Sequence, residues 1–128
     1  IEKSQGIAIR AGEVVLLHTG WGKILADNPD AILDQAGLNL EGAQYLAERG
    51  VVAVGADNMG VEYYPRDEHG RPKPEVHAFL LADRGIHLLE GVKTDELAKD
   101  KGYMFMFVLG LPRLKNAVQS PANPIAIR

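Results

Sequence analysis

The 128-residue sequence contains no cysteine, which excludes disulfide bonds and thiolate chemistry. It has no apolar run long enough to span a bilayer. Fourteen lysines and arginines stand against 17 aspartates and glutamates, and the formal charge of −3 argues against a general nucleic-acid or anionic-membrane binder. We therefore expect no nucleic acid and no membrane among its partners, and we predict a cytoplasmic location.

Compact metal-binding motifs are also absent from the sequence. It contains no HExxH, no paired cysteines and no EF-hand loop. Any metal site in this chain would therefore have to be completed by ligands from elsewhere. The first residues, 1–6, do not have the basic region followed by an apolar region that marks a signal peptide, and we expect none.

The composition is that of an ordinary globular protein, with 46% hydrophobic and 24% charged residues. A chain of this length buries roughly two thirds of its unfolded surface on folding, so it can build a core. We predict one domain over residues 1–128.

The most informative stretch, residues 74–91, predicts a helix, a glycine stop and a short strand that ends on a carboxylate. His77 is followed at i+3 and i+4 by Leu80 and Leu81, so its ring shares an apolar helix face. Glu90 follows an apolar run. An inward-facing imidazole and carboxylate both need partners, and a divalent metal, zinc or manganese, satisfies both. The alternative is a hydrogen-bonded core histidine, which is commoner, and the residue types alone leave both open.

The remaining pattern predicts strands that alternate with helices, the order of an α/β fold. Apolar runs predict buried strands at 13–18 and 51–57, an interior strand at 103–109, whose methionines are expected to pack, and a short edge strand within 120–128. Helical periodicity predicts a surface helix at 40–50 and one helical turn at 31–36.

Two residues beside the predicted strand ends are candidates for substrate binding. Trp21 lies between two glycines in a turn that should expose its ring, although a Trp that caps the core is the commoner arrangement. Asp57 stands just past a strand, where open α/β sheets place their ligands, but Asp-Asn at such a point more often caps a turn.

Six motifs follow one another along the chain: Val15–Trp21, Val54–Asp57, Val76–Leu81, Gly85–Glu90, Leu111–Lys115 and Ser120–Ala126. In this order they resemble the cyclase family of metal-dependent hydrolases, which includes bacterial kynurenine formamidase and isatin hydrolase. The likeness extends over nearly all of this chain but only the carboxyl-terminal half of the family's usual length. The family's amino-terminal signature, HxGTHxDxP, is absent.

The resemblance implies a mixed sheet with flanking helices in a swivelling β/β/α arrangement, present here as an incomplete copy. It implies that His77 and Glu90 are metal ligands, with His77 also able to transfer protons. It implies hydrolysis of an amide, formamide or lactam bond of a small molecule. By their place beside strand ends, Trp21, Met59 and Asp57 are our candidates for the substrate pocket. The expected partners are the family's amino-terminal half, without which this chain should be inactive, and further copies in a homo-oligomer. The alternative is a non-catalytic α/β scaffold or small-molecule-binding module that keeps the fold.

Overall fold

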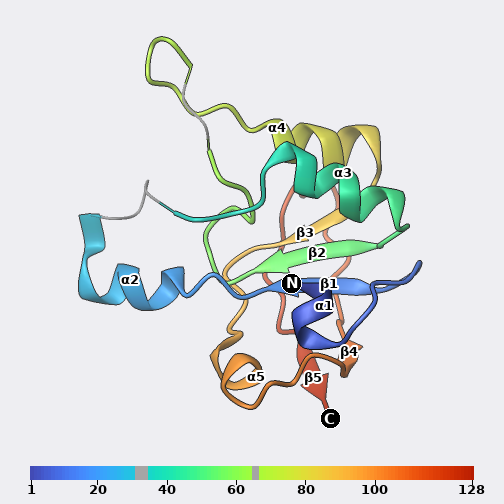
Figure 1. The fold of residues 1–128 in the computed structure, drawn as a ribbon. Helices are drawn as coiled ribbons and strands as arrows, with labels where there is room; N and C mark the ends of the chain where they lie inside the picture. Colours follow the sequence, from blue (N-terminus) through green and yellow to red (C-terminus); the bar gives the residue numbers. More distant parts are fainter. Residues whose placement is uncertain (31–34, 65–66) are drawn as a thin grey trace.

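The computed structural model describes residues 1–30, 35–64 and 67–128 (Figure 1). Residues 31–34 of the predicted helical turn at 31–36 therefore lie outside the described part, and Gln35 and Ala36 are not helical. The short helices outside the core are α1 (Glu2–Gln5), α2 (Trp21–Asp27) and α5 (Asp95–Lys99). No helix within the described residues is long and apolar enough to cross a membrane.

Three parallel strands form the central sheet in the order β1 (Val14–Leu17), β2 (Ala53–Ala56) and β3 (His87–Leu89). The register pairs Leu17 with Ala56 and Gly55 with Leu89. All four residues of β2 are buried, as expected for a continuously apolar strand in the middle of a parallel sheet. The predicted central strand at 51–57 is confirmed.

Helix α3 (Leu40–Glu48) and the helical segment after Pro74 cover one face of this sheet (Figure 1). Helix α3 begins at Asn39, whose side chain accepts the Gly42 N–H at 2.9 Å, so the predicted surface helix is confirmed. The core lies between the helices and the sheet and is apolar. Its buried residues are Ala43, Leu46, Val51, Val54, Ala56, Val61, Val76, Leu80 and Ile86.

The predicted helix that carries His77 is present. It starts as α4 (Glu75–His77) and continues as a π-helical segment, η2 (Ala78–Asp83). Gly85 has φ 65°, a left-handed conformation that favours glycine, and it reverses the chain so that Ile86 N–H donates to the Leu80 carbonyl at 2.8 Å. The chain then enters β3 and reaches Glu90.

The carboxyl-terminal region differs from the prediction of an interior strand at 103–109. Among the described strands, β4 (Met106–Val108) pairs with β5 (Ile125–Ile127) alone, as an antiparallel pair separate from the parallel sheet. Met104 and Met106 are 60% and 59% exposed, so the prediction that they pack in the interior is wrong. Apolar residues on both faces of a strand indicate burial only if other segments cover both faces, and no sequence pattern within the strand reveals that cover.

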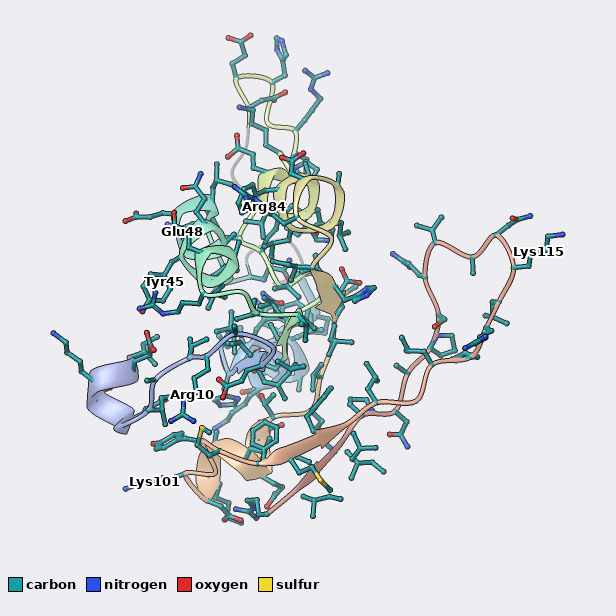
Figure 2. The ribbon with its side chains drawn as sticks, turned by 90° about the vertical axis from the view of Figure 1, so that its right-hand side faces the viewer. Arg10, Tyr45, Glu48, Arg84, Lys101 and Lys115 are labelled. Atoms are coloured by element: carbon teal, nitrogen blue, oxygen red, sulfur yellow. The ribbon has the colours of Figure 1, made fainter. Side chains whose placement is uncertain are left out.

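The arm that carries β4 and β5 extends away from the helices. Figure 1 shows the pair on the side of the sheet opposite α3 and α4, and Figure 2 shows the loop between the two strands, marked by Lys115, projecting from the rest of the chain. The α/β class with flanking helices is confirmed. The described strands form a parallel sheet and this separate antiparallel pair.

Candidate active site

Polar residues gather where the three parallel strands end, and two of them, Asp57 and Glu90, are predicted site residues. His18 directly follows β1, Asp57 directly follows β2 and Glu90 directly follows β3. Because parallel strands point the same way, all three residues lie along the carboxyl-terminal edge of one sheet. This edge is where open α/β sheets bind their ligands.

The structure brings the predicted pair of His77 and Glu90 together. His77 Nε2 lies 3.1 Å from Glu90 Oε1, although one residue belongs to helix α4 and the other to the end of β3. The side chains are 24% and 36% exposed, respectively, so both remain open to solvent on one side. The helix, the turn at Gly85 and the short strand act together to direct two residues 13 positions apart at one point.

A third residue, Glu62, completes this group and was not anticipated from the sequence. Its side chain is fully buried, and its Oε2 contacts the Nδ1 atom of the His77 ring. Oε2 also accepts the backbone N–H of His77 at 2.9 Å, and Oε1 accepts that of Val76 at 3.1 Å. Glu62 lies in a long loop without hydrophobic periodicity. The one sequence feature that could have indicated it is an acidic residue that directly follows the uncharged run Met59-Gly60-Val61.

The imidazole of His77 is thus held between two carboxylates. An ionised carboxylate only accepts hydrogen bonds, so Glu62 in that form pairs with a ring that carries its proton on Nδ1. The contact between Nε2 and Glu90 then requires either a second proton or a cation at that position. The group can therefore act as a proton-transfer site or offer one nitrogen and one oxygen to a metal ion.

The donor set fits part of a metal site. Imidazole nitrogen and carboxylate oxygen bind zinc at about 2.0–2.2 Å, which places two neighbouring tetrahedral ligands roughly 3.3 Å apart. The observed separation of 3.1 Å is close to that spacing. Within the described residues, however, no group of three His, Cys, Asp or Glu side chains could hold a metal ion. A complete site would need ligands in addition to His77 and Glu90.

Tyr64 lies beside the histidine. Its ring centroid is 6.1 Å from that of His77, with the ring planes tilted by 30°. Burial raises the pKa of the Tyr64 phenol above its ordinary value, and the negative charges of Glu62 and Glu90 raise it further. The Tyr64 hydroxyl therefore stays protonated near neutral pH and can donate a hydrogen bond.

Asp57 holds the turn after β1 together. Its Oδ1 accepts the N–H and the hydroxyl of Thr19 at 2.8 and 2.7 Å, and its Oδ2 accepts the Gly20 N–H at 2.7 Å. His18 Nδ1 lies 3.4 Å from Asp57 Oδ2 and 2.8 Å from Thr94 Oγ1. The Asp57 carboxylate caps a turn, as the commoner alternative predicted. The capped turn is the one after β1, at Thr19 and Gly20, and not a turn at Asn58. A substrate-binding role for Asp57 stays a prediction.

The other two substrate-pocket candidates differ in exposure. Trp21 is only 3% exposed, so the expectation that its turn exposes the ring is wrong. Gly20 adopts φ 75° and α2 begins at Trp21, which makes this residue helical and buried. Met59 is 52% exposed and can reach a ligand. Whether Trp21 or Met59 contacts a substrate stays a prediction.

A large cavity lies elsewhere in the described part of the chain. Its volume is about 1100 Å³, and it runs along β1 between the amino-terminal segment and residues 94–107. His18, Thr19 and Thr94 are among its polar lining residues, whereas Glu62, His77 and Glu90 do not line it. The cluster of Glu62, His77 and Glu90 therefore lies outside this cavity.

Residues 1–63 match the family model described as "Putative cyclase". That region includes β1, β2, Asp57 and Glu62, but it ends before His77 and Glu90. No curated protein matches the chain.

The fold is similar to a crystal structure of a novel cyclase, with a TM-score of 0.81 and 26% sequence identity. The match covers 99% of this chain and 44% of that protein, so this chain spans less than half of its length.

Proposed function

We propose that this chain is part of a metal-dependent hydrolase of the cyclase family that cleaves an amide, formamide or lactam bond. The observation that carries the proposal is the 3.1 Å separation of His77 Nε2 and Glu90 Oε1 at the carboxyl edge of a parallel sheet. The matches to the cyclase family model over residues 1–63 and to the cyclase structure support it.

In this proposal Glu90 is a metal ligand, and His77 is either a second ligand or the group that transfers protons. A bound divalent ion would polarise the substrate carbonyl and lower the pKa of a water molecule. The helix places Nε2 of His77 beside the Glu90 carboxylate, where it can accept a proton from water and return it to the leaving nitrogen. The Tyr64 ring lies beside the histidine, with the two ring centroids 6.1 Å apart.

Two donors do not hold a catalytic ion, and the described residues offer no group of three, so the proposal requires ligands in addition to His77 and Glu90. We assign them to the amino-terminal half that the family resemblance implies, which agrees with the 44% coverage of the cyclase structure. Trp21, Met59 and Asp57 remain the proposed substrate-pocket residues from this chain. Zinc or manganese is the proposed ion, since both accept nitrogen and oxygen ligands.

The test is turnover of N-formyl and cyclic amide substrates by the complete polypeptide that carries this chain. His77→Ala and Glu90→Gln should each abolish turnover. His87→Ala and Glu96→Gln are matched controls, because both side chains are exposed and have no contact with the site. Full turnover in both site variants would sink the proposal.

The second candidate is a non-catalytic binding module in which His77 and Glu90 only satisfy each other. The observation in its favour is that 3.1 Å is also an ordinary hydrogen-bond distance. Elemental analysis of the purified complete polypeptide separates the two functions. Zinc or manganese near one ion or more per chain supports the hydrolase, and a metal-free protein that remains fully folded and inactive on all amide substrates supports the module.

A further inference from the structure

The buried carboxylate of Glu62 is tied to His77 in two ways. Oε2 accepts the backbone N–H of His77 at 2.9 Å and contacts the Nδ1 atom of the same residue's ring. Oε1 accepts the Val76 N–H at 3.1 Å. One side chain thus holds both the backbone and the ring of His77, which leaves the imidazole little freedom to rotate.

The loop that carries Glu62 is held in an unusual conformation. Val61, directly before it, has φ 62°, a left-handed conformation that β-branched residues rarely adopt. The buried side chain of Asn58 stabilises this turn, since its Oδ1 accepts the Val61 N–H at 2.7 Å and its Nδ2 donates to the Ala36 carbonyl at 2.6 Å. Strained backbone persists only where the surroundings impose it, and here it directs the Glu62 carboxylate at the start of α4.

The segment around Leu38 fixes the loop from the other side. Leu38 N–H donates to the Val61 carbonyl and Tyr63 N–H donates to the Leu38 carbonyl, both at 2.9 Å. These two bonds form a short parallel bridge between Leu38 and Glu62. The position of Glu62 is therefore set by its own loop, by the segment around Leu38 and by the start of α4.

We propose that Glu62 is a positioning residue that holds the proton of the neutral His77 ring on Nδ1 and keeps the Nε2 lone pair directed at the Glu90 side of the site. A carboxylate can only accept, so it selects the Nδ1–H form of the ring. Carboxylates that accept from the second nitrogen of a metal-bound histidine orient the ring and increase its basicity. The role of Nε2 as a metal ligand or proton acceptor rests on the proposed function, whereas the assignment of the ring proton to Nδ1 does not.

The first measurement is nitrogen-15 NMR of the His77 ring in the metal-free complete polypeptide, at a pH at which the nitrogen shifts themselves identify a neutral ring. We expect the Nδ1–H form in the unmodified protein. In Glu62→Gln the amide group can donate to Nδ1, so the ring proton should move to Nε2. Glu62→Asp keeps a carboxylate and should restore Nδ1–H. Glu75→Gln is the matched control, because it removes a charge from an exposed side chain in the same helical turn.

The second measurement is the affinity of the same proteins for zinc alone. We expect a loss of about 10- to 100-fold in Glu62→Gln and little change in Glu75→Gln. If the unmodified protein binds no zinc, the proposed function fails, but the NMR measurement of the ring tautomer still tests the role of Glu62.

The inference is overturned if the unmodified neutral ring carries its proton on Nε2, a result that does not depend on whether any variant folds. It is equally overturned if folded Glu62→Gln keeps both the Nδ1–H form and the original zinc affinity. A folded Glu62→Asp that adopts the Nε2–H form also contradicts it, since a carboxylate would then not decide the tautomer.

Discussion

Gly37 lies against the backbone of Glu62 so closely that no other residue fits there. A Cβ atom at position 37 would lie 2.3 Å from the Glu62 carbonyl carbon and 2.4 Å from the Tyr63 nitrogen. Both are backbone atoms, which cannot move aside as the end of a flexible side chain can. The contact connects the segment before α3 to the residue that holds His77.

Replacing Gly37 with alanine should therefore destabilise the fold and displace Glu62. We expect a loss of about 1–3 kcal/mol in the free energy of unfolding, the usual cost of overpacking. Chemical denaturation measures it. Gly22→Ala is the control, because a Cβ there meets nothing within 4 Å and the residue is in a helix. Equal stability of Gly37→Ala and the unmodified protein would contradict the close approach.

The Tyr64 phenol should titrate above the ordinary range for tyrosine. Its folded-state pKa is raised by burial and by the charges of Glu62 and Glu90, so its contribution to stability is fully present below the unfolded pKa of about 10 and is lost as the pH rises through the folded pKa. Phenolate absorbance, taken as the difference between the metal-free protein and Tyr64→Phe, measures the pKa.

The same titration tests the charges around the histidine. Glu90→Gln removes one negative charge near Tyr64, so it should lower the Tyr64 pKa toward its ordinary value. Tyr63→Phe is the control, since Tyr63 is 52% exposed. An unchanged Tyr64 pKa in Glu90→Gln would show that this carboxylate does not act on the phenol.

Asp57→Asn should destabilise the turn after β1. The substitution replaces a carboxylate that accepts three hydrogen bonds from Thr19 and Gly20, and hydrogen bonds to a charged group contribute about 1.5–3 kcal/mol each. Because the amide oxygen can still accept some of these bonds, we expect a total loss of about 2–3 kcal/mol in the free energy of unfolding. The exposed Asp83→Asn serves as the control in thermal unfolding. A variant as stable as the control would show that the hydrogen bonds of Asp57 to Thr19 and Gly20 do not stabilise the fold.

Removing the proposed metal should abolish hydrolysis without unfolding the protein. The hydrophobic cluster between α3, η2 and the parallel sheet is held by contacts among apolar side chains, so its packing does not depend on an ion. A chelator should stop turnover by the complete polypeptide, and added zinc or manganese should restore it, while circular dichroism stays unchanged. Undiminished turnover in a sample that elemental analysis finds free of metal would exclude metal-dependent hydrolysis.

The local pattern was sufficient for the elements that surround His77. The helix after Pro74 and the glycine reversal at Gly85 form as predicted, because periodicity and a left-handed stop act over a few residues. The buried strand β2 also follows from its uninterrupted apolar run. The strand ending at Leu89 then brings Glu90 to the histidine, as the spacing of the two residues required.

Long-range packing decided the rest. Glu62 reaches His77 only because the left-handed Val61 and the bridge to Leu38 fold a loop back onto α4, and no periodic signal marks such a loop. The exposure of Met104 and Met106 likewise depends on which segments cover the β4–β5 pair. The sequence by itself thus determined the helix and strand that aim His77 and Glu90, since hydrophobic periodicity and backbone preference are local. Only the tertiary structure decided which carboxylate holds the ring and which apolar faces are covered, since these depend on contacts between distant segments.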